Sequence, residues 1–372
     1  MSEPRNRPLG NTSLPLIALT LLAGIALGWL LRDLSTWLLP SPAQPPASAT
    51  PAAAPAPTLG AAAPTPPAAS AMPAAAPSAT ALPTAPPATA QPTALPTLAP
   101  SATPAPDITG YAGHALAEGE TLDTLAAAGG STPDLIARYN RLAGAPQPGR
   151  ALIVPQLAGA TSTLTSQPLL VQRGPVTRPW VALTLDAGAS AEPVAGMLDT
   201  LRERGVTITF FLTGKWIKDN PELTRRIVAE GHEIANHTFN HPDMRNLSAE
   251  AIGNELDDTE AILGATAPGA SIRPFFRPPY GAYDERVLQL AEARGYLPVY
   301  WTLDSLDSVG EPKTPEFLLE RVTAKLTPEQ LRGAIILAHC GSQPTAEALP
   351  QILDRFAAMG FEVKKLSEVL GG

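Results

Sequence analysis

The C-terminal half of this chain predicts an α/β fold with a parallel sheet, either open or closed into a barrel. Short apolar and β-branched runs alternate there with longer segments of helical spacing, as in repeated strand–helix units. Polar residues also follow directly after several of the apolar runs. Because active sites on parallel α/β scaffolds lie at the carboxyl ends of the strands, these polar residues are the first candidates for a functional site.

The expected elements of this domain, which we place at residues 178–372, follow one another along the chain. The predicted strands are 181–185, 207–212, 232–235, 275–276, 297–301, 334–338 and 361–364. The predicted helices are 192–204, 221–230, 248–263, 284–294, 314–325 and 345–359. Pro221 suits the first turn of a helix and Ser248 is a preferred N-cap, so two of the helix starts have a local cause.

A smaller α+β domain is predicted at residues 113–156, in the order strand, helix, helix, strand (βααβ). Its elements are 114–116, 121–128, 133–140 and 151–154. Residues 157–177 are interpreted as a short linker between this domain and the α/β domain.

Residues 14–31 are almost wholly apolar and uncharged, and eighteen residues are just enough for a membrane-spanning helix. Arg5 and Arg7 precede this run, so the positive-inside rule places residues 1–13 in the cytoplasm and the later domains outside. A cleaved signal peptide is the alternative, but no small-x-small cleavage site directly follows the run. We therefore expect a single-pass signal anchor in the cell membrane, with the C-terminal domains extracellular and facing the cell wall.

Residues 40–107 consist mainly of Pro, Ala, Thr and Ser, and they hold many of the chain's 43 prolines. Such a segment has too few large apolar residues to bury a core, so we expect a disordered, extended tether. The formal net charge of −8 and the lack of a dense Lys/Arg cluster argue against nucleic acid as a partner. The single cysteine, Cys340, excludes an internal disulfide framework.

His237 and His241 stand four residues apart, after an apolar run and before Pro242. Two neutral imidazoles on one short segment are a common half of a zinc-type site. From the pair alone, the alternative is two polar loop residues without a metal. Further candidates at the ends of predicted strands are Asp186, Arg277, Asp304, Asp307 and His339. Singly they have plain interpretations, such as a turn Asp or a core His, but together at one face of one sheet they predict an active site.

Five short motifs carry a resemblance to a known family. They are 183–188 (LTLDAG), 237–241 (HTFNH), 277–281 (RPPYG), 304–307 (DSLD) and 337–339 (LAH), in this order. The set resembles the polysaccharide deacetylases with a NodB homology domain (carbohydrate esterase family 4), over about residues 178–372. The resemblance implies a distorted (β/α) barrel and the removal of N- or O-acetyl groups from glycans with a divalent metal.

The resemblance also implies a role for each candidate on the water side of the reaction. His237 and His241 would hold the metal, with Zn²⁺ as the first choice and Co²⁺ as the alternative. Asp186 would be the base that takes a proton from the attacking water. Arg277 would orient the Asp186 carboxylate and keep it ionised through a charge-assisted hydrogen bond.

On the leaving-group side, the resemblance implies that His339 is the acid that protonates the departing amine. Asp307 would support the protonated form of His339. The substrate would lie against Pro279 and Tyr280, and the backbone N–H of Tyr280 would donate to the developing oxyanion.

The sequence departs from the family pattern at the metal and in the substrate groove. The second of two adjacent aspartates is replaced by Ala187, which has no ligating atom, so the imidazole pair lacks its expected carboxylate partner. Ser308 stands where the family often has Trp, which removes an apolar wall of the groove. Cys340 directly follows His339 on a predicted strand, so their side chains are expected on opposite faces, which argues against a Cys–His nucleophile.

Residues 113–156 resemble a LysM domain, through GETL at 119–122, Asn140, and Pro148-Gly149 ahead of the last strand. This resemblance implies binding of glycans that contain N-acetylglucosamine, with Gly119 and Thr121 on one of the binding loops. A small spacer domain without a ligand is the alternative.

Together these features predict a metal-dependent deacetylase that hydrolyses N-acetyl groups of a cell-wall polysaccharide, with peptidoglycan N-acetylglucosamine as the leading substrate. Two alternatives remain open: a catalytically inactive, deacetylase-like wall protein that binds glycan, and a deacetylase of chitooligosaccharide or of an O-acetylated glycan. A cell-wall glycan (peptidoglycan or chitin-like) and the membrane are the expected partners, and no protein partner is implied.

Overall fold

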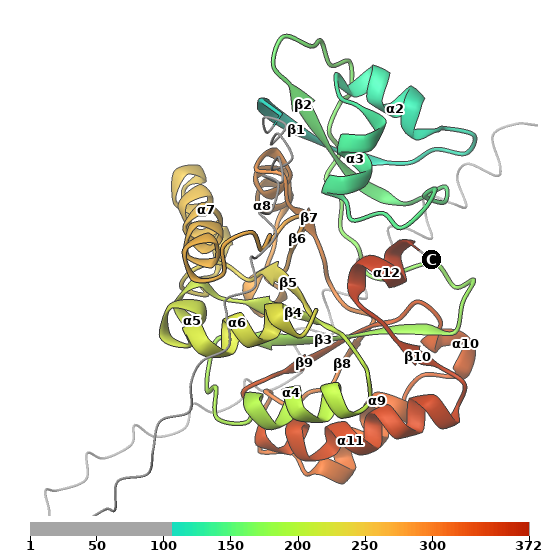
Figure 1. The fold of residues 1–372 in the computed structure, drawn as a ribbon, viewed down its shortest axis with the longest axis vertical. Coiled ribbons are helices and arrows are strands. Elements are labelled where there is room, and N and C mark those ends of the chain that lie inside the picture. Colours follow the sequence, from blue (N-terminus) through green and yellow to red (C-terminus); the bar gives the residue numbers. More distant parts are fainter. Residues whose placement is uncertain (1–105, 372) are drawn as a thin grey trace, which may run out of the picture. The chain divides into compact units, whose positions relative to one another are not determined.

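The structure is a computed structural model that describes residues 106–371 (Figure 1). The expected cytoplasmic tail, the apolar span at 14–31 and nearly all of the Pro-rich segment lie outside the described residues. Among the helices that are described, none is long and apolar enough to cross a membrane. The membrane anchor therefore stays a prediction.

The first described domain is a small βααβ module, in the order that the sequence predicts. Its elements are β1 (Ile108–Ala115), α2 (Leu122–Gly129), α3 (Pro133–Tyr139) and β2 (Ala151–Leu157), and the two strands pair antiparallel. β1 begins six residues before the predicted start, because Gly110 and Gly113 interrupt the apolar pattern that would reveal it. The buried Asn140 side chain donates to Ile153 O (2.6 Å) and accepts from Ile153 N (2.8 Å), which ties the end of α3 to β2.

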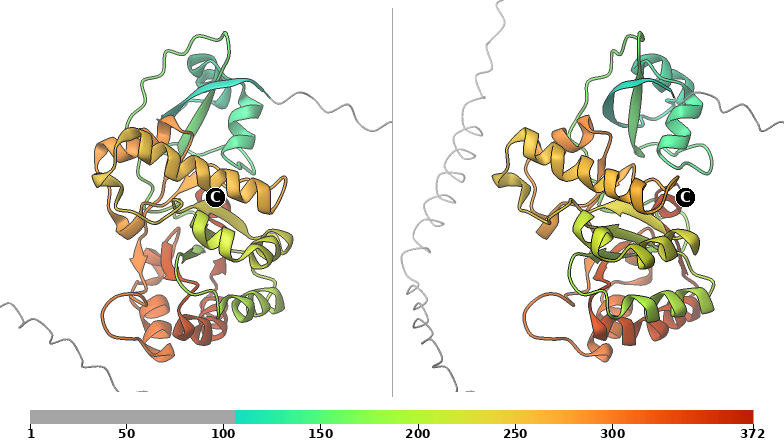
Figure 2. Two further views of the ribbon diagram at one scale, coloured as in Figure 1. Left: turned by 90° about the vertical axis from the view of Figure 1, so that its left-hand side faces the viewer. Right: turned by 60° about the vertical axis from the view of Figure 1, so that its left-hand side comes forward.

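The rest of the described chain forms one curled, parallel sheet covered by helices (Figures 1 and 2). The strand order is β7-β6-β5-β4-β3-β9-β8, and β10 pairs with β3 beside this row. The strands are β3 (Trp180–Ala187), β4 (Thr209–Leu212), β5 (Glu233–Asn236), β6 (Phe275–Phe276), β7 (Leu297–Pro298), β8 (Leu303–Asp304), β9 (Ile335–His339) and β10 (Glu362–Val363). Since β7 and β8 are the two ends of the row, the sheet is a half-barrel, and the predicted parallel α/β fold is confirmed.

The helices of this domain agree with the predicted set and add three short ones, α5, α10 and α12. The larger ones are α4 (Val194–Glu203), α6 (Pro221–Ala229), α7 (Ala249–Thr266), α8 (Glu285–Ala293), α9 (Pro315–Ala324) and α11 (Gln343–Ala358). The short ones are α5 (Gly214–Asp219), α10 (Pro328–Leu331) and α12 (Leu366–Gly371), and two 3-10 turns are η1 (Met244–Asn246) and η2 (Pro279–Gly281). α11 contacts both α9 and α4 (Figure 1).

Alternation along β3 explains where the polar residues of the sheet can go. Leu183 and Leu185 belong to the buried apolar cluster that includes the helix residues, whereas Thr184 and Asp186 face the other side of the strand. The same side carries the buried Phe211 of β4. The inner face of the curled sheet therefore carries polar side chains as well as aromatic rings. A functional site can form on this face.

Part of the predicted linker joins the sheet. Val171 makes a parallel bridge to Val299, just after β7, and Arg173 makes an antiparallel bridge to Ala334, just before β9. These contacts anchor the start of the α/β domain on both sides of the opening between β7 and β8.

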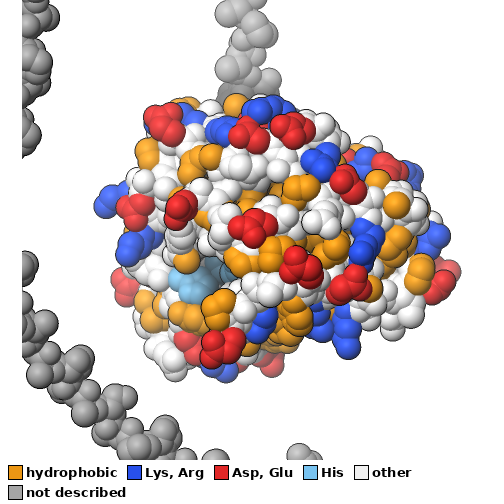
Figure 3. Space-filling model, turned by 90° about the horizontal axis from the view of Figure 1, so that it is seen from below, with side chains coloured by type: hydrophobic (Ala, Val, Ile, Leu, Met, Phe, Trp, Pro, Cys, Tyr) orange, Lys and Arg blue, Asp and Glu red, His pale blue; other side chains and the backbone are white. Residues whose placement is uncertain are grey.

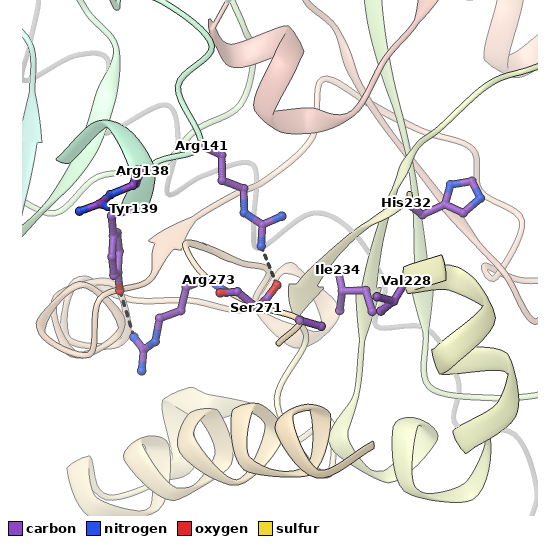
Figure 4. Close-up of a pocket in the computed structure, with 9 residues that line it drawn as sticks. Arg138, Tyr139, Arg141, Val228, His232, Ile234, Ser271 and Arg273 are labelled. Atoms are coloured by element: carbon purple, nitrogen blue, oxygen red, sulfur yellow. Dashed lines mark hydrogen bonds between the residues drawn. The ribbon is translucent and has the colours of Figure 1, made fainter. Parts of the chain in front are cut away.

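The βααβ module contacts the α/β domain around a cavity of about 310 Å³ (Figure 4). Tyr139 Oη at the end of α3 donates to Gly295 O (2.8 Å) and accepts from Arg273 Nη1 (3.2 Å). Arg141 Nη2 donates to Ser271 O (2.6 Å). Gly295, Ser271 and Arg273 all precede a strand, so the module lies at the amino ends of the strands and leaves the carboxyl ends uncovered.

Candidate active site

A cavity of about 510 Å³ lies at the carboxyl ends of the strands. Its lining includes six predicted residues, Asp186, His237, His241, Tyr280, Asp304 and His339. On the face drawn in Figure 3, histidine side chains gather in a hollow. Segments that are far apart in the sequence thus meet here, because the parallel strands all end at the same edge of the sheet.

Arg277, which follows β6, is completely buried and connects several parts of the site. Its Nη1 donates to Asp186 Oδ1 (2.6 Å) and to Thr184 Oγ1 (2.9 Å), and its Nη2 donates to Tyr300 O (3.2 Å). Its guanidinium also lies 3.9 Å from the centre of the Phe211 ring. Burial lowers the pKa of Arg277, and the adjacent Asp186 carboxylate opposes that shift. The carboxylate and the guanidinium thus compensate each other's charge inside the curl.

The two imidazoles face each other above this pair. His237 Nδ1 donates to Arg277 O (2.8 Å), which leaves His237 Nε2 as an acceptor 3.5 Å from Asp186 Oδ2. The centres of the His237 and His241 rings are 4.8 Å apart. Burial lowers the pKa of His237 to about 4, and it lowers the pKa of His241 as well. Both rings are therefore neutral near pH 7, the form in which imidazole binds metals.

This donor set fits a divalent metal of the zinc type but is short of one ligand. Among residues 106–371 no group of three His, Cys, Asp or Glu side chains is arranged to hold a metal ion. Ala187 ends β3, is buried, and belongs to the helix-side apolar cluster. The next residue, Gly188, lies close to the imidazole pair, since a Cβ added to it would be 3.9 Å from His241 Cδ2. Gly188 is thus next to the imidazoles, whereas the Ala187 side chain packs in the helix-side cluster and supplies no donor atom.

His339, at the end of β9, forms a second charged pair with Asp307. Its Nδ1 bonds Asp307 Oδ1 (2.7 Å), and its backbone N–H donates to Asp307 Oδ2 (2.8 Å). Thr345 Oγ1 also donates to Asp307 Oδ2 (2.6 Å). Burial alone would lower the pKa of His339, but the bond to Asp307 and the charge of Asp186 raise it. The partners of Asp307 hold its own pKa below the usual value against the effect of burial.

The register of β3 and β9 brings the Asp186–Arg277 pair next to the His339–Asp307 pair. Asp186 is paired directly with His339. The next residue, Cys340, points into the helix-side cluster, and burial raises the pKa of its thiol. Within the described chain Cys340 therefore behaves as a core side chain, as the strand alternation predicts.

The opposite wall of the cavity is formed by the turn η2 and by aromatic rings. Tyr280 has a φ of 60° and is 71% exposed, and its ring packs on His241 with centres 4.5 Å apart. Pro279 is buried behind it, and the neighbouring Pro278 lines the cavity instead. A Cβ at Gly281 would come within 2.7 Å of Trp301, so only glycine allows this turn to approach the ring.

Some lining residues are absent from the set predicted by sequence. Trp301 and Leu337 line the cavity in this way. Ser308, which was expected in the substrate groove, also lines the cavity, together with Val309 of the same loop after β8. Trp301 stacks on Tyr300 with ring centres 3.8 Å apart, which holds it in place. Trp301 could have been found from its position at the end of the predicted strand 297–301. Leu337 gave no such signal, because it looks like any other core residue of a strand.

Gly119 and Thr121 of the βααβ module do not line this cavity. Gly119 has a φ of 77° in the turn before α2, and the Thr121 side chain caps that helix. Glu120, between them, accepts from Ala117 N (2.9 Å) and bonds His114 Nε2 (2.7 Å). The two residues thus shape one loop of the module, separate from the site of the α/β domain.

The buried Asp186–Arg277 pair generates a stability prediction. An Arg277→Gln variant should lose about 3–5 kcal/mol of unfolding free energy at pH 7, because the Asp186 carboxylate would stay buried without its partner. Urea denaturation measures the change. Arg204→Gln is the matched control, because Arg204 pairs with Asp354 at the surface, where ion pairs contribute little. Equal losses in both variants would contradict the prediction.

Comparison with known proteins places this site in a family. The family model described as polysaccharide deacetylase matches residues 173–299. The peptidoglycan-N-acetylmuramic acid deacetylase PdaA of Bacillus subtilis is 33% identical over 192 residues, which are 51% of this chain and 71% of that protein. A chitooligosaccharide deacetylase of Rhizobium leguminosarum bv. trifolii is 33% identical over 202 residues, which are 50% of this chain and 90% of that protein.

A solved structure of a family 4 carbohydrate esterase pseudoenzyme from Bacillus anthracis is also similar. It has a TM-score of 0.51 and 30% sequence identity, and the match covers 56% of this chain and 70% of that one. The sequence relatives and the solved structure each match about half of this chain. The chain belongs to the polysaccharide deacetylases of carbohydrate esterase family 4, which are hydrolases acting on carbon–nitrogen bonds other than peptide bonds.

Proposed function

We propose that this protein is a metal-dependent deacetylase that hydrolyses N-acetyl groups of a cell-wall polysaccharide, with peptidoglycan N-acetylglucosamine as the leading substrate. The observation that carries the proposal is the meeting of three parts at one cavity. They are the Asp186–Arg277 pair, the facing imidazoles of His237 and His241, and His339.

The metal would be held by His237 and His241, with Zn²⁺ as the first choice and Co²⁺ as the alternative. A divalent metal in such a site lowers the pKa of water and polarises a carbonyl oxygen. Both imidazoles are buried enough to stay neutral near pH 7, so protons do not compete with the metal there. With only two protein ligands, the affinity should depend strongly on each imidazole.

Asp186 would act as the general base. Its Oδ1 is occupied by Arg277, while its Oδ2 is on the side of His237, toward the cavity. The charge-assisted hydrogen bond from the guanidinium holds the carboxylate in a fixed orientation, which a base needs before it can accept a proton. Arg277 is in this scheme a positioning residue.

His339 would act as the general acid. Its raised pKa favours the imidazolium, which can give a proton to the departing amine. Since Nδ1 is bound to Asp307, Nε2 is the nitrogen that is available for this transfer. The register pair of Asp186 with His339 puts the acid and the base on neighbouring strands.

The sugar would lie against the aromatic wall. Tyr280 is exposed at the cavity mouth and Trp301 lines the interior. Aromatic rings present apolar surface to the C–H face of a sugar. Ser308, which stands where the family often has Trp, and the adjacent Val309 also line the cavity. We keep chitooligosaccharide and O-acetylated glycans as further substrate candidates, because the family includes a chitooligosaccharide deacetylase.

The second candidate function is a wall protein that binds glycan without catalysis. Ala187 favours it, because catalytic zinc sites usually have three protein ligands. The similar structure from Bacillus anthracis is described as a pseudoenzyme, and a mutant of the same protein is described as having restored enzymatic activity.

The βααβ module and the N-terminal segment complete the proposal. We propose that the module is a LysM domain that binds the same cell-wall glycan through the loops of Gly119 and Thr121. Anchoring in the cell membrane through residues 14–31 would keep both domains outside the cell and within reach of the wall. Neither nucleic acid nor a protein partner is part of this proposal.

The first prediction concerns catalysis. With added Zn²⁺ or Co²⁺, the wild type should release acetate from peptidoglycan or chitooligosaccharides, and His237→Ala should abolish the release. Gln289→Ala is the control, because Gln289 is exposed on α8, outside both the cavity and the βααβ module, and should leave the rate unchanged. No release by the wild type from any of these substrates, or full activity of His237→Ala, rules the proposal out. Glycan binding without metal binding would then favour the inactive alternative.

A second prediction concerns the missing ligand. Ala187→Asp should bind Zn²⁺ on the order of ten-fold more tightly or better, because it restores the carboxylate that the family pattern has at this position, directly before Gly188, which lies close to the imidazole pair. Isothermal titration calorimetry measures the affinity. Ala187→Asn has nearly the same side-chain volume without the charge and is the control. The same affinity in Asp, Asn and wild type would mean that position 187 does not reach the metal.

A third prediction concerns pH. The acid form of His339 is the active one, so activity should fall as the pH rises through its raised pKa. Asp307→Asn removes the hydrogen-bonded carboxylate that raises this pKa, so the alkaline limb should move to lower pH. The pH–rate profile and an NMR titration of His339 check this, with the exposed Glu347→Gln as the control. If neither the alkaline limb of the pH–rate profile nor the NMR titration of His339 moves in Asp307→Asn, His339 is excluded as the acid.

A further inference from the structure

The loop that carries both imidazoles has a backbone that its own residues do not favour. Thr238 has a φ of 66° and His241 a φ of 62°, and neither is glycine. Left-handed conformations at such residues cost on the order of 1–3 kcal/mol each and persist only when the surroundings hold them. Something outside the loop must therefore supply the compensating contacts.

Glu255, on the second turn of α7, supplies such contacts through its carboxylate. Oε2 accepts the backbone N–H of Phe239 and that of Asn240, both at 2.8 Å. Oε1 accepts the side-chain amide of Asn240 at 2.9 Å. Two successive N–H groups and an amide thus converge on one carboxylate, between the two left-handed residues.

The same helix holds the entry to the loop. Asn236 Nδ2 donates to Leu256 O (3.0 Å), the residue after Glu255. Asn236 Oδ1 accepts the N–H of Thr238 (2.8 Å), which is the first left-handed position. Hydrogen bonds to α7 therefore fix the chain just before His237 and again just before His241.

On the carbonyl side, the loop is held by the start of α5. Gly214 N donates to Thr238 O (2.9 Å), and Lys215 N donates to Phe239 O (3.0 Å). The Phe239 ring covers Gly214 so closely that a Cβ there would lie 2.2 Å from the ring. The loop is thus held by hydrogen bonds on both sides, to backbone N–H groups of α5 and to the Glu255 carboxylate of α7.

We propose that Glu255 is a positioning residue for the imidazole pair: its carboxylate holds residues 238–241 in the geometry that turns His237 and His241 toward each other. The proposal rests on the metal-binding role given to the pair under the proposed function. Glu255 itself does not line the cavity, so it acts through the loop backbone. Carboxylates that accept two backbone N–H groups are strong, charge-assisted anchors, and an uncharged amide replaces only part of this.

Glu255→Gln is the informative variant, because it keeps the side-chain volume but turns one acceptor oxygen into an NH₂ donor. In the metal-free protein the backbone amides of Phe239 and Asn240 should exchange at least ten-fold faster than in the wild type. The nuclear Overhauser contact between the His237 and His241 rings should weaken. Affinity for Zn²⁺ or Co²⁺ should fall about 10–100-fold, the usual effect of losing an outer-shell partner of a metal site.

Asp258→Asn is the matched control. It removes one negative charge from an exposed position on the same helix, so all three measurements should stay at wild-type values. Glu255→Asp keeps the charge on a shorter side chain and should recover part of the metal affinity. This charge dependence separates positioning from a general loss of stability, which a thermal melt of each variant measures.

Several results would overturn the proposal. They are unprotected Phe239 and Asn240 amides in the wild type, an unchanged ring–ring contact in Glu255→Gln, or metal affinity within two-fold of the wild type despite faster exchange. The first of these needs no variant to fold. Failure of the proposed function looks different: the wild type would then bind no metal, while the exchange and ring contacts of the metal-free protein still test Glu255.

Discussion

The site depends on one buried guanidinium. Arg277 neutralises Asp186, bonds Thr184 and the Tyr300 carbonyl, and through its own carbonyl fixes the tautomer of His237. A charge in the interior is tolerated when it is paired with an opposite charge, as Arg277 is with Asp186. Asp186 and His237 therefore share a single support, so a shift of Arg277 would disturb both at once.

The parallel sheet supplies the rest of the geometry by register. Asp186 and His339 are direct partners on β3 and β9, and His237 and Arg277 follow the neighbouring β5 and β6. Each strand ends at the same edge, so short side chains reach one cavity without long loops. The βααβ module contacts residues that precede the strands, at the other end, so its docking leaves the cavity open.

Much of this could be predicted from sequence, because strand–helix alternation and the polar residues after each strand are local signals. The pattern could not reveal β8, whose residues Leu303 and Asp304 form no apolar or β-branched run, or the bridges of Val171 and Arg173, which depend on partners distant in the chain. Glu255 was missed for the same reason: on a helix it looks like any solvent-facing glutamate, and only the fold brings it to the loop. Thr345, which bonds Asp307, is a further case of long-range pairing.

The residues of the site differ in how strongly their presence argues for catalytic activity. Asp186 and Arg277 are buried together, so losing either alone would cost stability, and their presence is expected of any chain that keeps this fold. Ala187 lies outside their network, so a ligand at that position could be lost without unfolding the protein. His339 is different, because its side chain is 32% exposed at the cavity and its pKa is raised by a buried partner. Folding does not require a proton donor at that place, so the intact His339–Asp307 pair argues for catalysis more strongly than the Asp186–Arg277 pair does.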